Sequence, residues 1–360
     1  MSDVTDLSEV IAGTVQLRAR HLTRHFTTRT PGRGFNVKHI VRAVDDVSVD
    51  LVAGEVVAVV GESGSGKSVL ARMLARIVRP TAGDLILRGT QIPRKAKRSL
   101  AYASQVQLVL QDPFSSMNPV HKMRHNLVRP LLIHGAKRED VEALAEAALT
   151  RVSLEPPSRF LDRYPHELSG GQLQRVSIAR ALCVEPRVLL ADEPISMLDV
   201  SVRLGVLNLL RGLCDNDDLA ILYITHDIAS ARYIADEVIV MYAGQVVEHS
   251  RGTVLVDEPT HPYTQLLIAS VPDPADPTSV GAPTAEQVQM VIAEKGCRFN
   301  PRCPFVMDRC RVEEPPEFIV GENHTSRCWL HADKPQFEVE VALPQRRGGG
   351  GNYEDMNSYG

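Results

Sequence analysis

The residues with the clearest chemical meaning form the stretch GESGSGKS, Gly61 to Ser68, which fits the pattern G-x-x-x-x-G-K-[ST]. Glycines let such a loop curl until successive backbone N–H groups face inward and cradle phosphates, helped by the positive end of a following helix. Lys67 is then expected to neutralise the β- and γ-phosphates of a nucleotide, and the Ser68 hydroxyl to ligate Mg²⁺. The residues predicted to contact the nucleotide here are Gly61, Glu62, Ser63, Gly64, Ser65, Gly66, Lys67, Ser68 and Val69. A glycine- and serine-rich turn that binds nothing is the alternative.

A second acidic motif, VLLADE, ends at Glu193. A magnesium–nucleotide site needs a carboxylate at the end of a neighbouring buried strand, and Asp192 is placed to supply it. Glu193 at the mouth of that strand is placed to polarise an attacking water. An Asp-Glu pair by itself is also a common helix cap. The prediction therefore depends on GESGSGKS being present in the same chain.

The elements that must position these residues alternate between strands and helices from residue 14 to residue 270, which predicts an α/β core with a mainly parallel sheet. EVVAVVG is expected to be the strand before the phosphate-binding loop, and KSVLARMLARIV the helix after it. Helical spacing of apolar residues between Val202 and Leu213 predicts a further helix on the sheet. Other strands are predicted at Val106–Leu110, Arg187–Asp192, Leu219–Thr225 and Glu237–Tyr242.

Other segments differ in character from this core. Two helical patterns without a strand signal, MRHNLVRPLLIHG and REDVEALAEAALTRVSL, predict a helical subdomain inserted at residues 121–185. The segment RTPGRGFNVKH is expected to be an exposed loop between two N-terminal strands. Prolines and small residues predict a linker at 271–295, and the glycine-rich end predicts a disordered tail at 345–360.

Composition limits the function. The chain has 360 residues, of which 44% are hydrophobic, and that is ample for one large domain plus an appendage. A net charge of −4 gives no overall basic footprint, so no nucleic-acid partner is expected. Without a signal peptide or an apolar run near the ~18 residues needed to cross a bilayer, the chain is predicted to be soluble and cytoplasmic. Any membrane role would come through partners.

The segment LSGGQ, Leu168 to Gln172, precedes the helical pattern QLQRVSIARAL. With the other motifs in this order, residues 14–270 resemble the ATP-binding subunit of an ABC transporter. The resemblance implies that ATP and Mg²⁺ are the cofactors and that the fold has an N-terminal antiparallel β subdomain. The ordered motifs are Phe26 in HLTRHF, GESGSGKS, Gln111 in VLQDPFSSMNP, LSGGQ, VLLADE, SMLD at Ser196 to Asp199, and His226 in ITHD.

The resemblance also implies a role for each motif. Phe26 is expected to stack on the adenine, although an aromatic residue near a strand end can be simple packing. The LSGGQ segment is expected to form an anion-binding cap for ATP held by an opposite subunit, so that each chain has half of each site. Its contact residues are Ser169, Gly170, Gly171 and Gln172. Mg²⁺ is expected at Ser68, Gln111 and Asp192, and the catalytic set is Glu193, His226, Lys67 and Gln111.

Three segments, VLQDPFSSMNP, THPYTQLLIASVP and GCRFNPRCPFVMDRC, extend the resemblance to about residue 331 and to the oligopeptide/dipeptide import branch. The resemblance implies a bacterial importer at the cytoplasmic face of the cell membrane. Its other parts would be two transmembrane permeases, a second ATPase in a homo- or heterodimer, and an extracytoplasmic solute-binding protein. Phe114 and Met117 either grip a permease or belong to the core. A nickel or oligosaccharide importer, a regulatory nucleotide-binding subunit, and a soluble ATPase of this class without a permease remain alternatives.

Four cysteines, spaced Cys297-x5-Cys303-x6-Cys310-x17-Cys328, define a Cys-rich region at residues 296–335. A cytosolic chain favours metal binding over disulfides. Spacings of five and six residues are wide for a zinc knuckle, whereas four thiolates can hold a 4Fe-4S cluster, which the resemblance also implies. Zinc remains the alternative, and the cluster's role is either structural or redox-sensing. Arg298, Arg302, Arg309 and Arg327 are expected to offset the cluster's negative charge, while Cys183 and Cys214 are expected to be packing residues.

Overall fold

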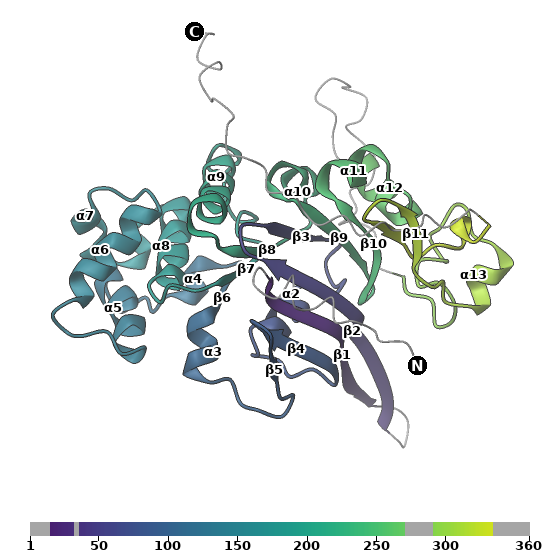
Figure 1. The fold of residues 1–360 in the computed structure, drawn as a ribbon, viewed down its shortest axis with the longest axis horizontal. Helices are drawn as coiled ribbons and strands as arrows, with labels where there is room; N and C mark the ends of the chain where they lie inside the picture. Colours follow the sequence, from purple (N-terminus) through teal and green to yellow (C-terminus); the bar gives the residue numbers. More distant parts are fainter. Residues whose placement is uncertain (1–14, 32–35, 271–290, 334–360) are drawn as a thin grey trace, which may run out of the picture.

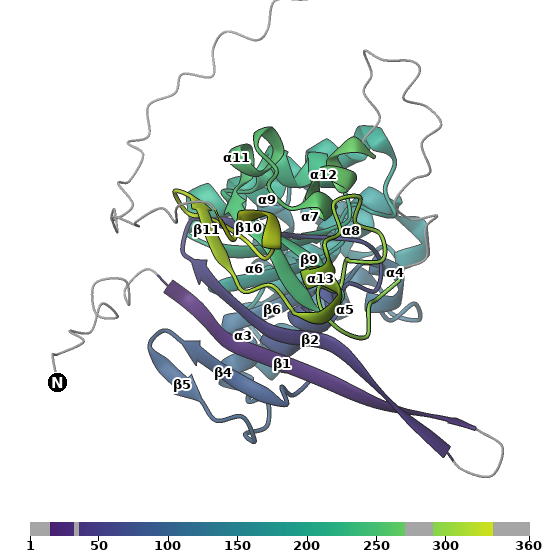
Figure 2. The same ribbon diagram turned by 90° about the vertical axis from the view of Figure 1, so that its right-hand side faces the viewer.

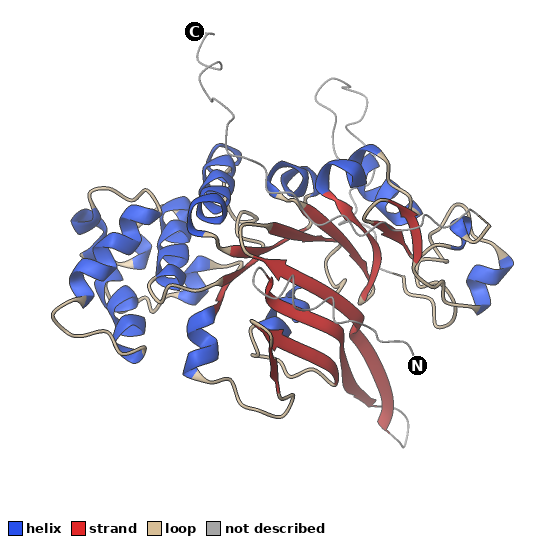
Figure 3. Cartoon of the chain, in the orientation of Figure 1, coloured by secondary structure: helices blue, strands red, loops and turns tan. Residues whose placement is uncertain are grey.

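The computed structural model describes residues 15–31, 36–270 and 291–333. The predicted tail at 345–360 lies outside the described residues, as does most of the predicted linker. Among the described residues, no helix is both long enough and apolar enough to span a bilayer. The α/β class is confirmed, and its strands form two separate sheets (Figures 1 and 3).

The larger sheet has eight strands in the order β11-β12-β10-β9-β3-β8-β7-β6. Its inner strands, from β6 to β9, run parallel to their neighbours, as predicted. The outer strands from β10 to β11 are antiparallel, so the sheet is mixed. The strands are β3 (Val56–Val60), β6 (Val106–Val109), β7 (Val188–Asp192), β8 (Ala220–Thr225), β9 (Glu237–Tyr242), β10 (Gln245–Arg251), β11 (Phe318–Gly321) and β12 (His324–Ser326).

The smaller sheet is antiparallel throughout, in the order β2-β1-β4-β5. Its first two strands form a long hairpin that extends away from the body of the molecule in Figure 2. The strands reach Pro31 and resume at Asn36, so most of the predicted loop RTPGRGFNVKH is strand. The strands are β1 (Val15–Pro31), β2 (Asn36–Val52), β4 (Ala82–Leu87) and β5 (Thr90–Ile92).

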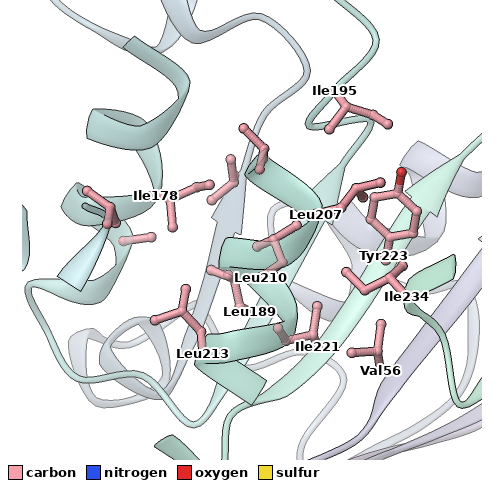
Figure 4. Packing of buried hydrophobic residues seen from close by; sticks show 14 of the residues in the cluster. Val56, Ile178, Leu189, Ile195, Leu207, Leu210, Leu213, Ile221, Tyr223 and Ile234 are labelled. Atoms are coloured by element: carbon pink, nitrogen blue, oxygen red, sulfur yellow. The ribbon is translucent and has the colours of Figure 1, made fainter. Parts of the chain in front are cut away.

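Side chains of β3 show how the larger sheet is buried on both faces. Val57 and Val59 pack with α2 (Lys67–Leu74) on the side of the smaller sheet. Val56, which alternates with them, packs on the opposite face, where α9 (Val200–Asp217) and α10 (Ile228–Ile234) cover the strands. Figure 4 shows this second core, in which Leu210 of α9 lies near Leu189 and Ile221 of neighbouring strands. A sheet covered on both faces requires continuous apolar strands, and VVAVV is one.

The remaining helices lie around the larger sheet. The helical subdomain occupies the end next to β6, at the left of Figure 1. Its helices are α5 (Met123–Ile133), α6 (Val141–Arg151), α7 (Pro157–Leu161) and α8 (Gly170–Leu182). Shorter helices are α3 (Leu100–Gln105), α4 (Pro113–Ser116), α11 (Gly252–Asp257) and α12 (Pro262–Ala269).

Residues 291–333 form a small unit at the opposite end, which we call the appendage. It contains α13 (Asp308–Val312), β11 and β12, and a minor core of Cys310, Phe318 and Trp329. Because β12 pairs with β10, the appendage continues the larger sheet of the core. A buried contact of 2.8 Å between His324 Nε2 and Glu248 Oε1 reinforces this junction.

Candidate nucleotide site

The loop Gly61–Ser68, called here the phosphate loop, connects β3 to α2. Gly66 precedes the helix with φ of 106°, and a Cβ atom there would lie 2.1 Å from the carbonyl oxygen of Ala43. Only glycine combines that backbone conformation with such a close approach. The turn therefore points the N-terminus of α2 and its unpaired N–H groups into the space above the loop.

Lys67 is buried at the start of α2. Its Nζ donates hydrogen bonds to the carbonyl oxygens of Gly61 at 2.6 Å and Glu62 at 2.9 Å. Burial lowers the pKa of Lys67, and the negative charges of Glu193, Asp192 and Glu62 oppose this effect. The ammonium group is thus held near the loop by backbone oxygens, in the position from which it can reach a phosphate.

Ser68 and Asp192 meet across two elements. The hydroxyl of Ser68 on α2 donates to Asp192 Oδ1 at the end of β7, at 2.8 Å. Burial raises the pKa of Asp192, and the hydrogen bond from Ser68 partly opposes that rise. A hydroxyl and a carboxylate oxygen in contact are the ligand types that Mg²⁺ prefers, so this pair fits the ion.

Glu193 receives two side chains from different strand ends. Nε2 of Gln111 donates to Glu193 Oε2 at 2.9 Å, and Nδ1 of His226 lies 3.4 Å from the same oxygen. The hydrogen bond with His226 lowers the pKa of Glu193 despite its partial burial. Glu193 is therefore ionised at neutral pH, at the edge where β6, β7 and β8 end.

These residues surround a cavity of about 920 Å³. From the predicted set, the cavity is lined by Ser63, Gly64, Gly66, Lys67, Ser68, Val69, Gln111, Glu193 and His226. Gly61, Glu62, Ser65 and Asp192 belong to the same loop and strand end but are outside this lining. Glu62 instead points away from the cavity toward Arg302.

Phe26, predicted to stack on the adenine, does not line the cavity. Its neighbour His25 does. The guanidinium of Arg24 lies over the Phe26 ring, 4.5 Å from its centroid. His25 contacts Asp45 at 3.1 Å between Nε2 and Oδ1. The strand register of β1 is irregular at Arg24 and His25, and a one-residue shift exchanges the faces on which side chains lie.

The LSGGQ segment lies at the start of α8 in the helical subdomain. Ser169 caps this helix: its Oγ accepts from Gln172 N–H at 3.3 Å, and Gln172 Oε1 accepts from Ser169 N–H at 3.1 Å. Of the described residues that line the cavity, none belongs to LSGGQ. Gly171 is buried against Val202 of α9. Gly171 therefore serves helix packing as well as any anion-binding role.

Phe114 and Met117 follow Gln111 within the segment VLQDPFSSMNP, and each could either contact a permease or belong to the core. Phe114 is 49% exposed, whereas Met117 is 3% exposed and belongs to the core. Only Phe114 is therefore available for contact with a partner. It lies on α4, close to the helical subdomain.

The four cysteines of the Cys-rich region gather within the appendage. The pKa of Cys297 is raised to about 11 and that of Cys328 to about 12, mainly by burial and in smaller part by nearby cysteines. Cys310 and Cys328 are buried, and Cys303 is half-buried. No group of three or more His, Cys, Asp or Glu in the described ranges is placed to hold a metal ion.

The arginines that flank these cysteines are directed elsewhere than expected. Arg298 pairs with Asp45, and Arg302 with Glu62. Arg309 stacks over Trp329 at 3.5 Å, and Arg327 lies 3.5 Å from Asp46. Each guanidinium thus has a carboxylate or an aromatic ring as its partner, and its charge is directed to that partner.

Sequence reasoning missed the contribution of the appendage to the cavity. Ile292, Ala293, Glu294, Arg298 and Glu314 line it beside the phosphate loop. No local motif could have indicated this, because the contacts join segments more than 200 residues apart. Ser196 of the SMLD segment also lines the cavity, and its position after VLLADE was an available signal.

A mixed sheet with an antiparallel subdomain, a helical subdomain and a phosphate loop facing a Glu-Gln-His set defines an ATP-binding cassette. Residues 44–196 match the family model described as ABC transporter, and residues 247–310 match the one described as oligopeptide/dipeptide transporter, C-terminal region. Two solved structures share the fold. One is an ATP-binding cassette in a dimeric post-hydrolysis state bound to ADP and Pi, with TM-score 0.57, 27% identity, and coverage of 65% of this chain and 98% of that one. The other is part of an ABC transporter complex of Clostridium perfringens, with TM-score 0.58, 25% identity, and coverage of 68% and 92%.

Curated relatives extend over nearly the whole chain. A probable peptide ABC transporter ATP-binding protein of Sinorhizobium fredii is 40% identical over 339 residues, which are 91% of this chain and 95% of that protein. A di/tripeptide transport ATP-binding protein of Pseudomonas aeruginosa is 41% identical over 317 residues, or 86% and 96% of the two chains. The chain therefore belongs to the family of ABC transporter ATP-binding proteins, and its enzymatic activity is ATP hydrolysis.

Proposed function

We propose that this chain hydrolyses ATP to power the import of oligopeptides or dipeptides by a bacterial membrane transporter. The observation that supports it most is the division of the site: the cavity is lined by Lys67, Gln111 and Glu193, while LSGGQ lies apart from it. A second cassette, as in the dimeric relative bound to ADP and Pi, would bring its own LSGGQ to this cavity. The names of the curated relatives and the oligopeptide/dipeptide C-terminal match support the peptide substrate.

The chain's own residues have distinct tasks in hydrolysis. Phosphates of ATP bind at the N-terminus of α2, and Lys67 moves from its two backbone acceptors to the β- and γ-phosphates. Ser68, Gln111 and Asp192 would hold Mg²⁺, which would supply charge neutralisation when bound. Most of the catalytic effect is then positioning and electrostatic stabilisation.

Glu193 is assigned to the attacking water. Gln111 and His226 both contact its Oε2, and we assign water orientation to the other oxygen, Oε1. A carboxylate whose pKa is lowered is ionised at working pH, so it can accept a hydrogen bond from water at once. His226 lines the cavity beside it and is assigned to the γ-phosphate.

The proposed assembly places two cassettes on the cytoplasmic face of the membrane, bound to two permeases and served by an extracytoplasmic solute-binding protein. Phe114, exposed on α4 next to the helical subdomain, is the proposed contact with a permease. A large exposed aromatic residue is a common anchor at protein interfaces. The second cassette is either a copy of this chain or a related one.

The test is Glu193→Gln in the reconstituted transporter, with ATP turnover and peptide uptake measured together. Turnover is expected to fall at least about 100-fold, and uptake to stop, while ATP still binds. Full ATP turnover by this variant would support a regulatory subunit. Uptake of nickel or an oligosaccharide, but not of peptides, would reassign the substrate.

For the four cysteines we propose a 4Fe-4S cluster with a structural role. No group of three or more His, Cys, Asp or Glu among the described residues is placed to hold a metal ion, so the proposal rests on the four cysteines themselves and on their spacing, which is wide for a zinc knuckle. Four thiolates could hold a 4Fe-4S cluster, and the influence of Cys297, Cys303 and Cys310 on the pKa of Cys328 supports their proximity. Iron and acid-labile sulfide analysis of anaerobically purified protein tests this. Zinc without iron would overturn it.

A further inference from the structure

Arg302 of the appendage forms an ion pair with Glu62 of the phosphate loop in the ATP-binding core. Its Nη1 and Nη2 each donate to one carboxylate oxygen of Glu62, both at 2.8 Å. The Arg302 side chain is 10% exposed and that of Glu62 is 5% exposed. A bidentate ion pair of this kind fixes the orientation of both side chains as well as pairing their charges. Because both side chains are nearly buried, water and salt screen the pair little.

Glu62 is the second residue of the phosphate loop, and its backbone is held too. Its N–H donates to the hydroxyl of Tyr263 at 2.8 Å. Its carbonyl oxygen accepts from Lys67 Nζ at 2.9 Å and from Ser65 N–H at 3.2 Å. Fixing Glu62 therefore fixes the backbone oxygen on which Lys67 rests before a phosphate arrives.

Charge gives the pair a second effect. Glu62 is close enough to Lys67 for its negative charge to raise the pKa of Lys67, against the larger lowering by burial. If Arg302 were absent, a buried carboxylate would stand behind the loop that must bind a triphosphate, without the guanidinium that pairs with it. Like charges repel more strongly when little water separates them.

A second arginine of the same loop of the appendage, Arg298, lines the cavity itself. Arg298 donates to the carbonyl oxygen of Ala243 at 2.6 Å and pairs with Asp45 of β2. Phe299, between the two arginines, packs edge-on against Tyr242 and in a tilted arrangement against Tyr263. One short segment of the appendage thus reaches the cavity wall and the phosphate loop together.

We propose that the appendage is part of the nucleotide site and that Arg302 is a positioning residue, which neutralises Glu62 and holds the phosphate loop ready for ATP. The proposal rests on the ATP site of the proposed function and adds a dependence of ATP affinity on residues outside the cassette. Neither the peptide substrate nor the metal content of the appendage enters into it.

The test compares ATP affinity in the full chain, using a fluorescent ATP analogue with Mg²⁺ in titration. Arg302→Met is expected to raise the Kd about tenfold, because Glu62 keeps its charge and loses its partner. The double variant Arg302→Met with Glu62→Gln is expected to recover most of that loss. Arg311→Met, an exposed arginine of the same appendage, removes the same charge and is expected to leave the Kd unchanged.

Recovery in the double variant separates a charge effect from damage to the fold, because neutralising Glu62 cannot repair a collapsed appendage. Melting temperatures of all variants are measured alongside. If Arg302→Met is too unstable to purify, Arg302→Lys keeps the charge without the fork and is expected to raise the Kd about threefold. A wild-type Kd in Arg302→Met, or no recovery in the double variant, overturns the proposal. A wild-type chain that binds no ATP overturns the proposed function as well.

Discussion

A Cβ atom on Gly171 would lie 2.4 Å from Cγ1 of Val202. Gly171 is in the first turn of α8 and Val202 is in the first turn of α9, so the two helices touch where both begin. Real Cβ atoms do not approach a carbon so closely. The second glycine of LSGGQ is therefore required by packing within this chain.

Gly171→Ala is expected to lower the free energy of unfolding by about 1–3 kcal/mol, the usual cost of adding a methyl group to a tight contact. Val202→Ala in the same chain is expected to restore much of the loss, since it removes the opposing atom. Chemical denaturation measures both. The matched control is Gly170→Ala, whose Cβ would meet its nearest neighbour at an ordinary 3.5 Å. Equal effects of the two glycine substitutions on stability would contradict the packing argument.

Ser68→Ala is expected to weaken magnesium-dependent ATP binding about tenfold or more, because it removes a proposed ligand and the hydrogen bond that orients Asp192. ATP binding in the presence of a chelator should change little, since the backbone N–H groups of the loop remain. Titration of ATP with and without Mg²⁺ separates the two. A similar loss under both conditions would show that Ser68 acts on the phosphates and not through the metal.

His261 predicts a specific dependence of stability on pH. Burial lowers its pKa to about 4, with Glu248 opposing and His331 reinforcing the shift. The unfolded chain takes up a proton below about pH 6.5, so this contribution is complete above that pH and is lost as the pH falls toward 4. Between pH 7.5 and pH 5 the loss is on the order of 2 kcal/mol.

His261→Asn is the variant that checks this dependence. Asparagine can still accept the hydrogen bond that Tyr263 N–H donates to His261 Nδ1 at 3.0 Å, so the start of α12 stays capped. Urea denaturation at the two pH values should show a pH-dependent loss smaller by that amount in the variant. An identical loss in both proteins would rule out His261 as its source.

Glu248→Gln is expected to destabilise the junction between the core and the appendage by about 1.5–3 kcal/mol, the scale for hydrogen bonds to a buried charged group. Glu248 accepts from the backbone N–H groups of Thr260 and His261 and pairs with His324 of β12. Thermal unfolding, and proteolysis of the appendage, report the change. Glu317→Gln, at an exposed appendage position, is the control and is expected to leave both readouts unchanged.

Much of the core could be predicted from local patterns. VVAVV and VLLAD are unbroken apolar runs, which is what a sheet buried on both faces requires, and they are β3 and β7. The phosphate loop likewise depends on neighbouring residues in the chain. Ser68 and Asp192 could be predicted to meet because parallel strands end at one edge of the sheet.

Contacts that depend on distant segments could not be predicted in this way. Arg302 and Glu62 are 240 positions apart, and nothing around either residue indicates its partner. Phe26 illustrates a different difficulty. Alternation along a strand determines which side chain faces a cavity, but the register of β1 is irregular at this point, and His25 lines the cavity instead.

The pairing of β12 with β10 has a practical consequence for producing shorter forms of this protein. A fragment ending at Ser270 would keep every phosphate-binding residue. It would also leave the outer edge of β10 bare, and exposed edges of this kind recruit other chains. Such a fragment is expected to aggregate during expression through this exposed strand edge, and it would also lack Arg302, the partner of Glu62 in the phosphate loop.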